Sequence, residues 1–120
     1  MNNRRQNIGR WGEDVAAKYL VSQGYTLLAR NLRTGRGEID IVACKEDRLI
    51  FVEVKTRSSN AFGFPETAVT PKKQKHMLAA AEQYLQDNPD SSDTWQFDVI
   101  AVERVPGHEP VVTQFENVLS

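Results

Sequence analysis

The chain of 120 residues lacks several features that define particular classes of protein. Its one cysteine, Cys44, excludes a disulfide framework within the chain and any zinc site of the CxxC type. Five prolines and seven glycines, beside 40% hydrophobic and 26% charged residues, exclude collagen-like, low-complexity and disordered chains. No apolar run approaches the roughly 18–20 residues of a membrane span, and the N-terminus has no apolar signal core. We therefore expect one cytoplasmic domain of ordinary size with no membrane partner.

Positive charge is scarce in the second part of the chain, although the formal net charge is only −1. Residues 1–75 hold 14 lysines and arginines against 8 aspartates and glutamates, a balance of +6. Residues 76–120 hold one arginine, Arg104, against 8 acidic residues, a balance of −7. A chain polarised in this way can present a basic face to nucleic acid while its total charge stays near zero. A solvated surface without a partner is the alternative that charge alone leaves open.

Apolar periodicity and turn residues predict a helix, three strands, a second helix, a further strand and a weaker tail. The first helix is expected over about residues 7–23, with this inward stripe: Ile8, Trp11, Val15 and Tyr19. The second helix is expected from its cap Thr70 to Asn88, with this inward stripe: Met77, Leu78, Ala81, Tyr84 and Leu85. The strands are expected at residues 25–33, 38–44, 48–57 and 97–102, with an edge strand around Val111 and Val112.

These elements predict a small α/β domain in which a mixed sheet carries a helix on each face. The first three strands pair as an antiparallel meander, and the second helix returns the chain to a strand parallel to the third. The domain is expected to cover residues 1–120, with its core at about 7–105 and a tail or edge strand at 106–120. The long connection 58–70 carries Phe62 and Phe64, which either pin it to the core or contact a ligand.

Charged residues interrupt two of the apolar strands. Asp40 stands between two isoleucines in the second strand, while Glu53 and Lys55 alternate with valines in the third. Residues two apart in a strand share a face, so Glu53 and Lys55 are expected to point the same way. A two-residue turn at 46–47 would set Asp40 opposite Glu53 and Glu38 opposite Lys55, and would gather the apolar residues on the other face. Those apolar residues are Ile39, Ile41, Ala43, Ile50, Val52 and Val54.

Two carboxylates on a mostly buried sheet repel each other and stay ionised only beside a compensating positive charge. A hard cation such as Mg²⁺ takes one or two carboxylates together with waters and phosphate oxygens, which suits Asp40 and Glu53. Lys55 would then orient or deprotonate an attacking water. The alternative is a cluster of cross-strand ion pairs on an exposed face of the sheet.

Two further polar residues belong to the helices. Glu13 is flanked on the first helix by Gly9, Gly12 and Ala16, small residues that would let a backbone or a ligand approach its carboxylate. The alternative is that the glycines serve helix–sheet packing and that Glu13 is solvated. Gln74, at the inward-facing start of the second helix, either holds a metal-bound water or a phosphate, or is an amide satisfied at the helix end.

Basic residues gather near this presumed site. Lys72, Lys73 and Lys75 crowd the start of the second helix, where positive side chains oppose the helix dipole. An approaching phosphate would relieve that conflict and accept hydrogen bonds from the free backbone N–H groups. Further positive charge comes from Arg33, Arg36 and Arg57. Solvation alone would explain each of these side chains singly.

Several short motifs occur together in the chain. They are Gly9-x-x-Gly12-Glu13, Asn31-Leu-Arg33, Gly37-Glu-Ile-Asp40-Ile-Val, Phe51-Val-Glu-Val-Lys-Thr-Arg57, Ala68-Val69, Lys73-Gln74 and Phe97-Asp-Val-Ile-Ala-Val102. Over about residues 7–105 this combination resembles the YraN family of small bacterial proteins. That family is similar to the PD-(D/E)XK nucleases, with Holliday-junction resolvases among its closer relatives. The resemblance implies a restriction-endonuclease-like fold, which is a mixed β-sheet flanked by helices.

The resemblance also implies roles for individual residues. Asp40 and Glu53 match the two metal-binding acids and Lys55 the catalytic lysine, while Ile39 replaces the proline that names the superfamily. Glu13 matches an acid that many resolvase-like members supply from their first helix. Gln74 resembles the polar residue often found on the helix after the lysine strand.

The implied function is a Mg²⁺- or Mn²⁺-dependent endonuclease that acts on branched or otherwise structured DNA. The metal would be held by Glu13, Asp40, Glu53 and the carbonyl of Val54, and Lys55 would position the hydrolytic water. Basic residues would bind the DNA backbone without reading bases, and a homodimer is expected by the same resemblance. Two alternatives stay open: a module that keeps the fold and binds nucleic acid or protein without catalysis, and a structural protein whose carboxylates only pair with lysines.

Overall fold

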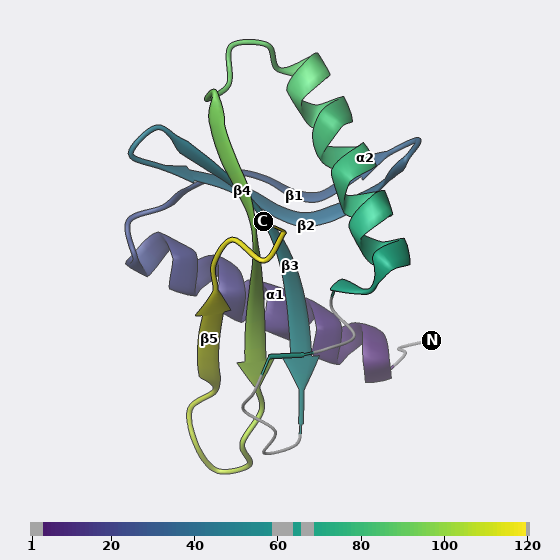
Figure 1. Ribbon diagram of the computed structural model, residues 1–120. Coiled ribbons are helices and arrows are strands. Elements are labelled where there is room, and N and C mark those ends of the chain that lie inside the picture. The colour runs from purple at the N-terminus through teal and green to yellow at the C-terminus, as the bar shows by residue number, and fades with distance from the viewer. Residues whose placement is uncertain (1–3, 59–63, 66–68, 120) are drawn as a thin grey trace.

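The computed structural model describes residues 4–58, 64–65 and 69–119, except for the side chains of residues 4–6. One five-stranded sheet, ordered as its strands follow in the chain, lies between two helices (Figure 1). The elements are α1 (Arg4–Ser22), β1 (Thr26–Thr34), β2 (Gly37–Lys45), β3 (Arg48–Arg57), α2 (Pro71–Asp87), β4 (Thr94–Glu103) and β5 (Val111–Phe115). The predicted mixed α/β fold is confirmed. Neither helix in these ranges combines the length and the hydropathy that a bilayer crossing requires.

The sheet has the predicted topology. Strands β1, β2 and β3 form an antiparallel meander, and β4 runs parallel to β3 because α2 carries the chain back between them. The β2–β3 hairpin turns at Glu46 and Asp47, whose φ angles of 52° and 65° are those of a two-residue type I′ turn. Strand β4 begins three residues earlier than predicted, at Thr94, and β5 forms the edge strand antiparallel to it.

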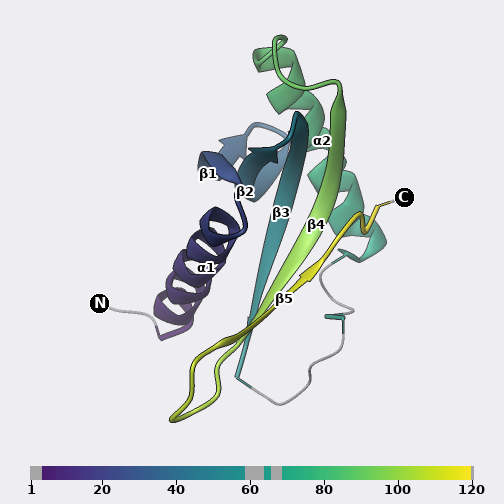
Figure 2. The ribbon, with the colours of Figure 1, turned by 90° about the vertical axis from the view of Figure 1, so that its left-hand side faces the viewer.

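The two helices cover opposite faces of the sheet (Figure 2). On one face Ala16 and Leu20 of α1 pack against a layer of buried aliphatic residues. That layer is Ile41, Ala43, Ile50, Val52, Ile100 and Val102. On the other face Met77, Ala80 and Ala81 of α2 pack against residues that include two phenylalanines. These residues are Ile39, Val42, Leu49, Phe51 and Phe97. Each helix therefore buries small side chains, which brings its backbone close to the sheet.

Both predicted helix stripes need correction. On α1 the buried line is Gly12, Ala16 and Leu20, and the larger predicted residues are only partly buried beside it. Those flanking residues are Trp11, Val15 and Tyr19. On α2 the predicted inward residue Leu78 is 40% exposed, because the close approach of α2 leaves its neighbours Met77 and Ala81 in the contact.

One residue of β2 lies on the face that the alternation did not predict. Ile41 and Ala43 face α1 as expected, but Ile39 packs on the α2 side together with Val42. The β2–β3 pairing ends at Ile41 and Val52, so residue 39 is free of that ladder and turns towards α2.

In the connection after β3, Phe64 packs edge-on against Phe115 with ring centroids 5.2 Å apart. This contact favours the expectation that the phenylalanines of the connection hold it to the core. Phe62 lies outside the described residues.

Candidate metal and nucleic-acid site

The site lies where β2 and β3 separate. The predicted register is confirmed by the pairs Ile41–Val52 and Ala43–Ile50; the ladder ends there, and Asp40 and Glu53 are the next residue of each strand beyond its last pair. At that step the carboxylate of Asp40 replaces the β2 backbone as acceptor, because its Oδ2 receives the N–H of Val54 at 2.8 Å. The β2–β3 ladder ends at Ile41 and Val52, and Asp40 lines a groove beyond that last pair, which we call the gap.

The backbone of Val54 also faces this gap. The N–H and C=O of one residue in an extended strand point to the same side, and the N–H of Val54 points to Asp40. The carbonyl oxygen of Val54 therefore lies on the β2 side of β3, beyond the last β2–β3 pair at Ile41 and Val52. It offers a neutral oxygen ligand next to the Asp40 carboxylate.

Glu53 is almost fully buried beside Asp40, at 7% exposed. Burial and, after it, the negative charge of Asp40 raise the pKa of Glu53 to about 7, although Lys73 and Lys55 oppose the shift. Burial is also the main cause that raises the pKa of Asp40. Lys73 of α2 reaches Glu53 with its Nζ 3.0 Å from Oε1. The negative charges of Asp40 and Glu53 are therefore only partly compensated, even though Lys73 contacts Glu53.

Glu13 approaches the same gap from α1. Glu13 and Asp40 line the same groove, and burial and then the charge of Asp40 raise the pKa of Glu13. Arg30 of β1 holds Glu13 at 3.4 Å and Asp14 at 2.8 Å. Acids from α1, β2 and β3 therefore converge here, because the separated strands let groups from both faces of the sheet meet.

These residues line an open groove of about 460 Å³. Its lining is Ile8, Gly9, Glu13, Asp40, Glu53, Val54, Lys55 and Thr56. The structure separates the roles of the two glycines. A Cβ on Gly12 would lie 1.8 Å from Oγ1 of Thr56, so Gly12 serves close packing of α1 on β3. A Cβ on Gly9 would meet nothing within 4 Å, so Gly9 leaves open space at the groove.

Within residues 4–58, 64–65 and 69–119, no three Asp, Glu, His or Cys side chains are already clustered as a metal site. Arg30 and Lys73 hold two of the three acids. The donor set nevertheless fits Mg²⁺, which needs only one or two carboxylates when waters and phosphate oxygens complete its shell. The half-buried carboxylate of Asp40 and the buried one of Glu53, both with raised pKa values, supply that minimum together with the backbone carbonyl of Val54.

The remaining predicted residues lie around this centre or away from it. Arg33 and Arg36 form surface ion pairs with Glu38 and Glu82, at 3.3 and 3.4 Å. Lys72 and Lys75 are exposed on the first turns of α2. The amide of Gln74 donates to the carbonyl of Val69 at 3.2 Å, which is the satisfied arrangement expected as the alternative to a ligand role.

Arg57 lies in a different environment from the other predicted basic residues. Its guanidinium is mostly buried and forms an ion pair with Glu103, which is 1% exposed on the neighbouring strand β4. Its charge is therefore compensated inside the protein. We leave Arg57 out of the proposed nucleic-acid interface.

Sequence reasoning missed the contact of Lys73 with Glu53 and the buried acids of β4. Asp98 is fully buried and accepts hydrogen bonds from Gln96, Gln114 and the backbone N–H of Asn117. It fastens β5 and the segment after it to the sheet. An acid in the middle of an apolar strand was the only signal for this role in the sequence.

Comparison with known proteins places the chain in a family. Among solved structures, SfsA of Pyrococcus furiosus in complex with Ca²⁺ aligns with a TM-score of 0.39 and 12% identity, over 93% of this chain and 63% of that one. The UPF0102 protein of Syntrophotalea carbinolica is 49% identical over 115 residues, 96% of this chain and 93% of the relative. That of Chlorobaculum parvum is 52% identical over 97 residues, 81% of this chain and 75% of the relative. A family model described as "Uncharacterised protein family UPF0102" matches residues 12–102. The chain therefore belongs to the UPF0102 family, which is the YraN family that its motifs resemble.

Proposed function

We propose that this protein is a Mg²⁺- or Mn²⁺-dependent endonuclease that hydrolyses phosphodiester bonds in branched or otherwise structured DNA. The observation that carries the proposal is the pair formed by the half-buried Asp40 and the buried Glu53, which line one groove together with Lys55. Two acids that are costly to ionise without a cation, in a groove open to solvent, suit a metal site better than a structural role.

Each residue of the groove has a defined task in this proposal. Asp40, Glu53 and the carbonyl of Val54 would hold the ion, and Glu13 would join them on leaving Arg30. A bound Mg²⁺ supplies charge stabilisation at the scissile phosphate and a water of lowered pKa. Lys55 would orient the attacking water with its ammonium group, from the same strand that carries Glu53.

Lys73 would change its ion-pair partner when the groove binds metal and substrate. Its ammonium group pairs with Glu53 at 3.0 Å, so it holds part of the charge that a cation would otherwise hold. A phosphate of the substrate offers Lys73 a second anionic partner at the start of α2. We propose that Lys73 moves from Glu53 to that phosphate when metal and substrate bind.

The DNA backbone would be held by a basic rim, which we define as Arg33, Arg36, Lys72 and Lys75. Arg33 and Arg36 lie at the end of the β1–β2 hairpin, and Arg36 contacts Glu82 of α2, so hairpin and helix form one surface. Contacts of this kind fix the position of DNA without reading its sequence. A homodimer, which would present two such grooves to a branched substrate, stays a prediction that sedimentation can measure.

The proposal is tested with purified protein and Mg²⁺ or Mn²⁺ on junction, flap, single-stranded and linear DNA. Wild type is expected to cleave a branched substrate, and Asp40→Asn and Lys55→Ala are each expected to lose at least about a hundredfold in rate. Lys18→Ala removes an exposed lysine of α1 away from the groove and should cleave like wild type. Equal cleavage by all four proteins would point to a contaminating nuclease and sink the proposal.

A second candidate is a nucleic-acid- or protein-binding module that has the same groove but no catalysis. The ion pairs of Glu13 with Arg30 and of Glu53 with Lys73 favour it, since the chain's own cations partly satisfy the acids. Calorimetric titration separates the two candidates. The endonuclease predicts a saturable Mn²⁺ heat that Asp40→Asn removes, whereas the binding module predicts salt-sensitive DNA binding with no such heat.

A further inference from the structure

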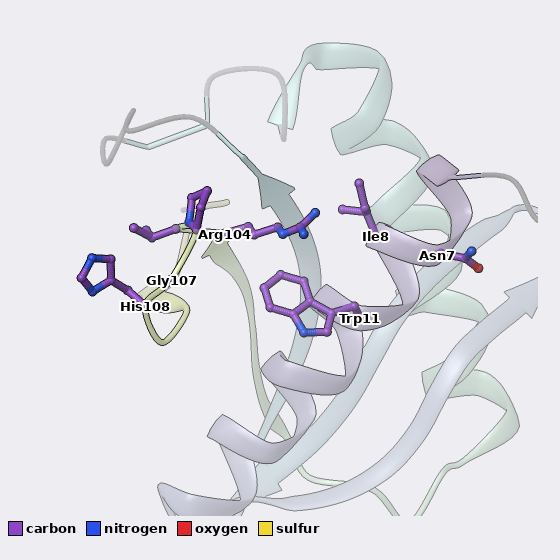
Figure 3. Close-up of a pocket in the computed structure, with 8 residues that line it drawn as sticks. Asn7, Ile8, Trp11, Arg104, Gly107 and His108 are labelled. Atoms are coloured by element: carbon purple, nitrogen blue, oxygen red, sulfur yellow. The ribbon is translucent and has the colours of Figure 1, made fainter.

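A second cavity of about 490 Å³ lies between the start of α1 and the connection from β4 to β5 (Figure 3). Its walls include Asn7, Ile8, Trp11, Arg104, Pro106 and His108. The volume is within the range of roughly 300–1,000 Å³ that small-ligand sites occupy. Arg104 and His108 lie outside the residues matched by the family model, and none of the roles proposed above uses this cavity.

The indole of Trp11 projects from α1 into this cavity, as Figure 3 shows. It is partly buried and packs against the aliphatic core layer under α1, which restrains it. Arg104, directly after β4, extends its guanidinium from the opposite wall towards Ile8 and Trp11 (Figure 3). The imidazole of His108 points away from Trp11 in the same view, so it offers no contact to a ligand held at the indole.

The charge of Arg104 is available to a ligand. Four other arginines pair with acids: Arg30, Arg33, Arg36 and Arg57. Across the part of the chain that the structure describes, Arg104 forms no such pair, and its side chain is exposed. It is also the one basic residue other than histidine in the acidic stretch 76–120. A lone guanidinium beside an anchored indole favours a ligand with both an anionic group and a flat ring.

The cavity adjoins the candidate metal groove. Ile8 lines both spaces, and Gly9 and Glu13 of the groove lie on the same helix as Trp11. A strand of nucleic acid whose phosphate occupies the groove could therefore place a neighbouring nucleotide here. We propose that this cavity binds one unpaired nucleotide, with its base stacked on Trp11 and its phosphate against Arg104.

This assignment rests on the proposed function and narrows its substrate class. Aromatic side chains and arginine planes stack unpaired bases of any sequence, because every base has a π-face. A base inside an intact duplex cannot reach the indole without leaving its own stack. The cavity would thus favour DNA that has an unpaired nucleotide next to the cleaved bond, such as the branch point of a flap or junction.

The test measures binding in EDTA, so that no cleavage is needed. A Trp95→Phe protein keeps Trp11 as its one tryptophan, and a single-stranded oligothymidine of about 12 residues, close to the site size of one single-strand-binding module, is expected to quench its fluorescence saturably. Anisotropy of the labelled oligomer then compares variants. Trp11→Leu and Arg104→Gln are each expected to weaken binding at least about fivefold, and Trp11→Phe, which keeps a ring, less than Trp11→Leu. Arg48→Gln, an exposed arginine in the β2–β3 hairpin, is the control that should bind like wild type.

Absence of quenching in the Trp95→Phe protein would overturn the assignment, as would equal weakening by Arg104→Gln and Arg48→Gln. Circular dichroism of Trp11→Leu identifies loss of fold, and Arg104→Gln and Trp11→Phe decide the matter if that variant unfolds. Cleavage of branched DNA by wild type without quenching of Trp11 would reject this site and leave the proposed function standing. Quenching without cleavage under any metal would do the reverse.

Discussion

At the scale of single residues, the ionisation of Glu53 sets the most direct link between structure and pH. The side chain is 7% exposed and lies beside Asp40, so its charged form loses water and gains a negative neighbour. The folded pKa of about 7 stands above the ordinary value of 4.5. Between those two values the folded protein holds a proton that the unfolded chain has lost, so the free energy of unfolding falls as pH rises.

Wild type should therefore lose stability as the pH rises from about 4.5 to about 7, whereas Glu53→Gln, which cannot ionise at this position, should not. In EDTA at about pH 8 we expect the variant to exceed wild type by about 1–3 kcal/mol in free energy of unfolding, since the raised pKa of Glu53 already includes its attraction to Lys73. At about pH 5 the two proteins should differ by under about 1 kcal/mol. Urea unfolding at both pH values measures this, and an equal difference at both would show that Glu53 does not titrate as described.

Two glycines of α1 give a matched pair of substitutions on one helix. A Cβ on Gly12 would strike Thr56 at 1.8 Å from Oγ1 and at 3.0 Å from its Cβ, whereas a Cβ on Gly9 meets open space. Gly12→Ala should cost about 1–3 kcal/mol by forcing α1 away from β3. Gly9→Ala should gain up to about 1 kcal/mol from helix propensity. Thermal unfolding of both variants checks the pair, and a stable Gly12→Ala protein would contradict the close contact.

At the scale of elements, an ion pair joins the ends of β3 and β4. Arg57 and Glu103 are directly opposite in the parallel ladder, and both are largely removed from solvent. Glu103→Ala should cost about 3–5 kcal/mol, because it leaves the buried guanidinium without its counter-charge. The double variant Arg57→Met with Glu103→Leu should recover most of that loss. Urea unfolding measures both, and a double variant no better than the single one would show that packing rather than charge decides.

The strand pairing that builds the candidate site was predictable because it depends on local rules. The alternation of apolar residues and the two-residue turn at Glu46 and Asp47 fix the β2–β3 register, and that register brings Asp40 and Glu53 to the end of the ladder together. The same rules failed at Ile39, just beyond the last ladder pair, where no pairing with β3 holds the side chain to one face.

Sequence reasoning could not supply contacts between elements that are distant along the chain. Lys73 meets Glu53, and Arg57 meets Glu103, only because α2 and β4 pack where they do. From sequence alone, a basic residue is predicted to be an exposed side chain, because its acidic partner cannot be identified. The exposure of Leu78 has the same origin, since the depth of α2 on the sheet is set by Met77, Ala80 and Ala81 rather than by its own periodicity.

At the scale of the whole molecule, the charge division along the chain is kept in part, although Arg36 and Arg57 of the basic part pair with Glu82 and Glu103 of the acidic part. The basic rim comes from the start of α2 and the β1–β2 hairpin: Lys73 joins the start of α2 to Glu53 of the groove, and Arg36 joins the hairpin to Glu82, later in α2. The acids of residues 87–93, by contrast, lie at and directly after the far end of α2. A polyanion would therefore approach from the rim, and long-range attraction would orient it before any short contact forms.

The salt dependence of DNA binding measures how many DNA phosphates the basic rim neutralises. For duplex DNA the slope of log K against log salt concentration changes by about 0.9 for each phosphate contact. Lys72→Gln and Lys75→Gln should each lower the slope by nearly that amount and the double variant by about twice as much, since both lysines are exposed. Lys18→Gln, on the opposite helix, should leave it unchanged. Arg36→Gln should lower the slope less, because Glu82 already screens that guanidinium at 3.4 Å.

Binding isotherms for a DNA junction in EDTA, from about 50 to about 200 mM salt, yield these slopes. Equal slopes for wild type and the Lys72 and Lys75 variants would move the DNA to another face of the molecule.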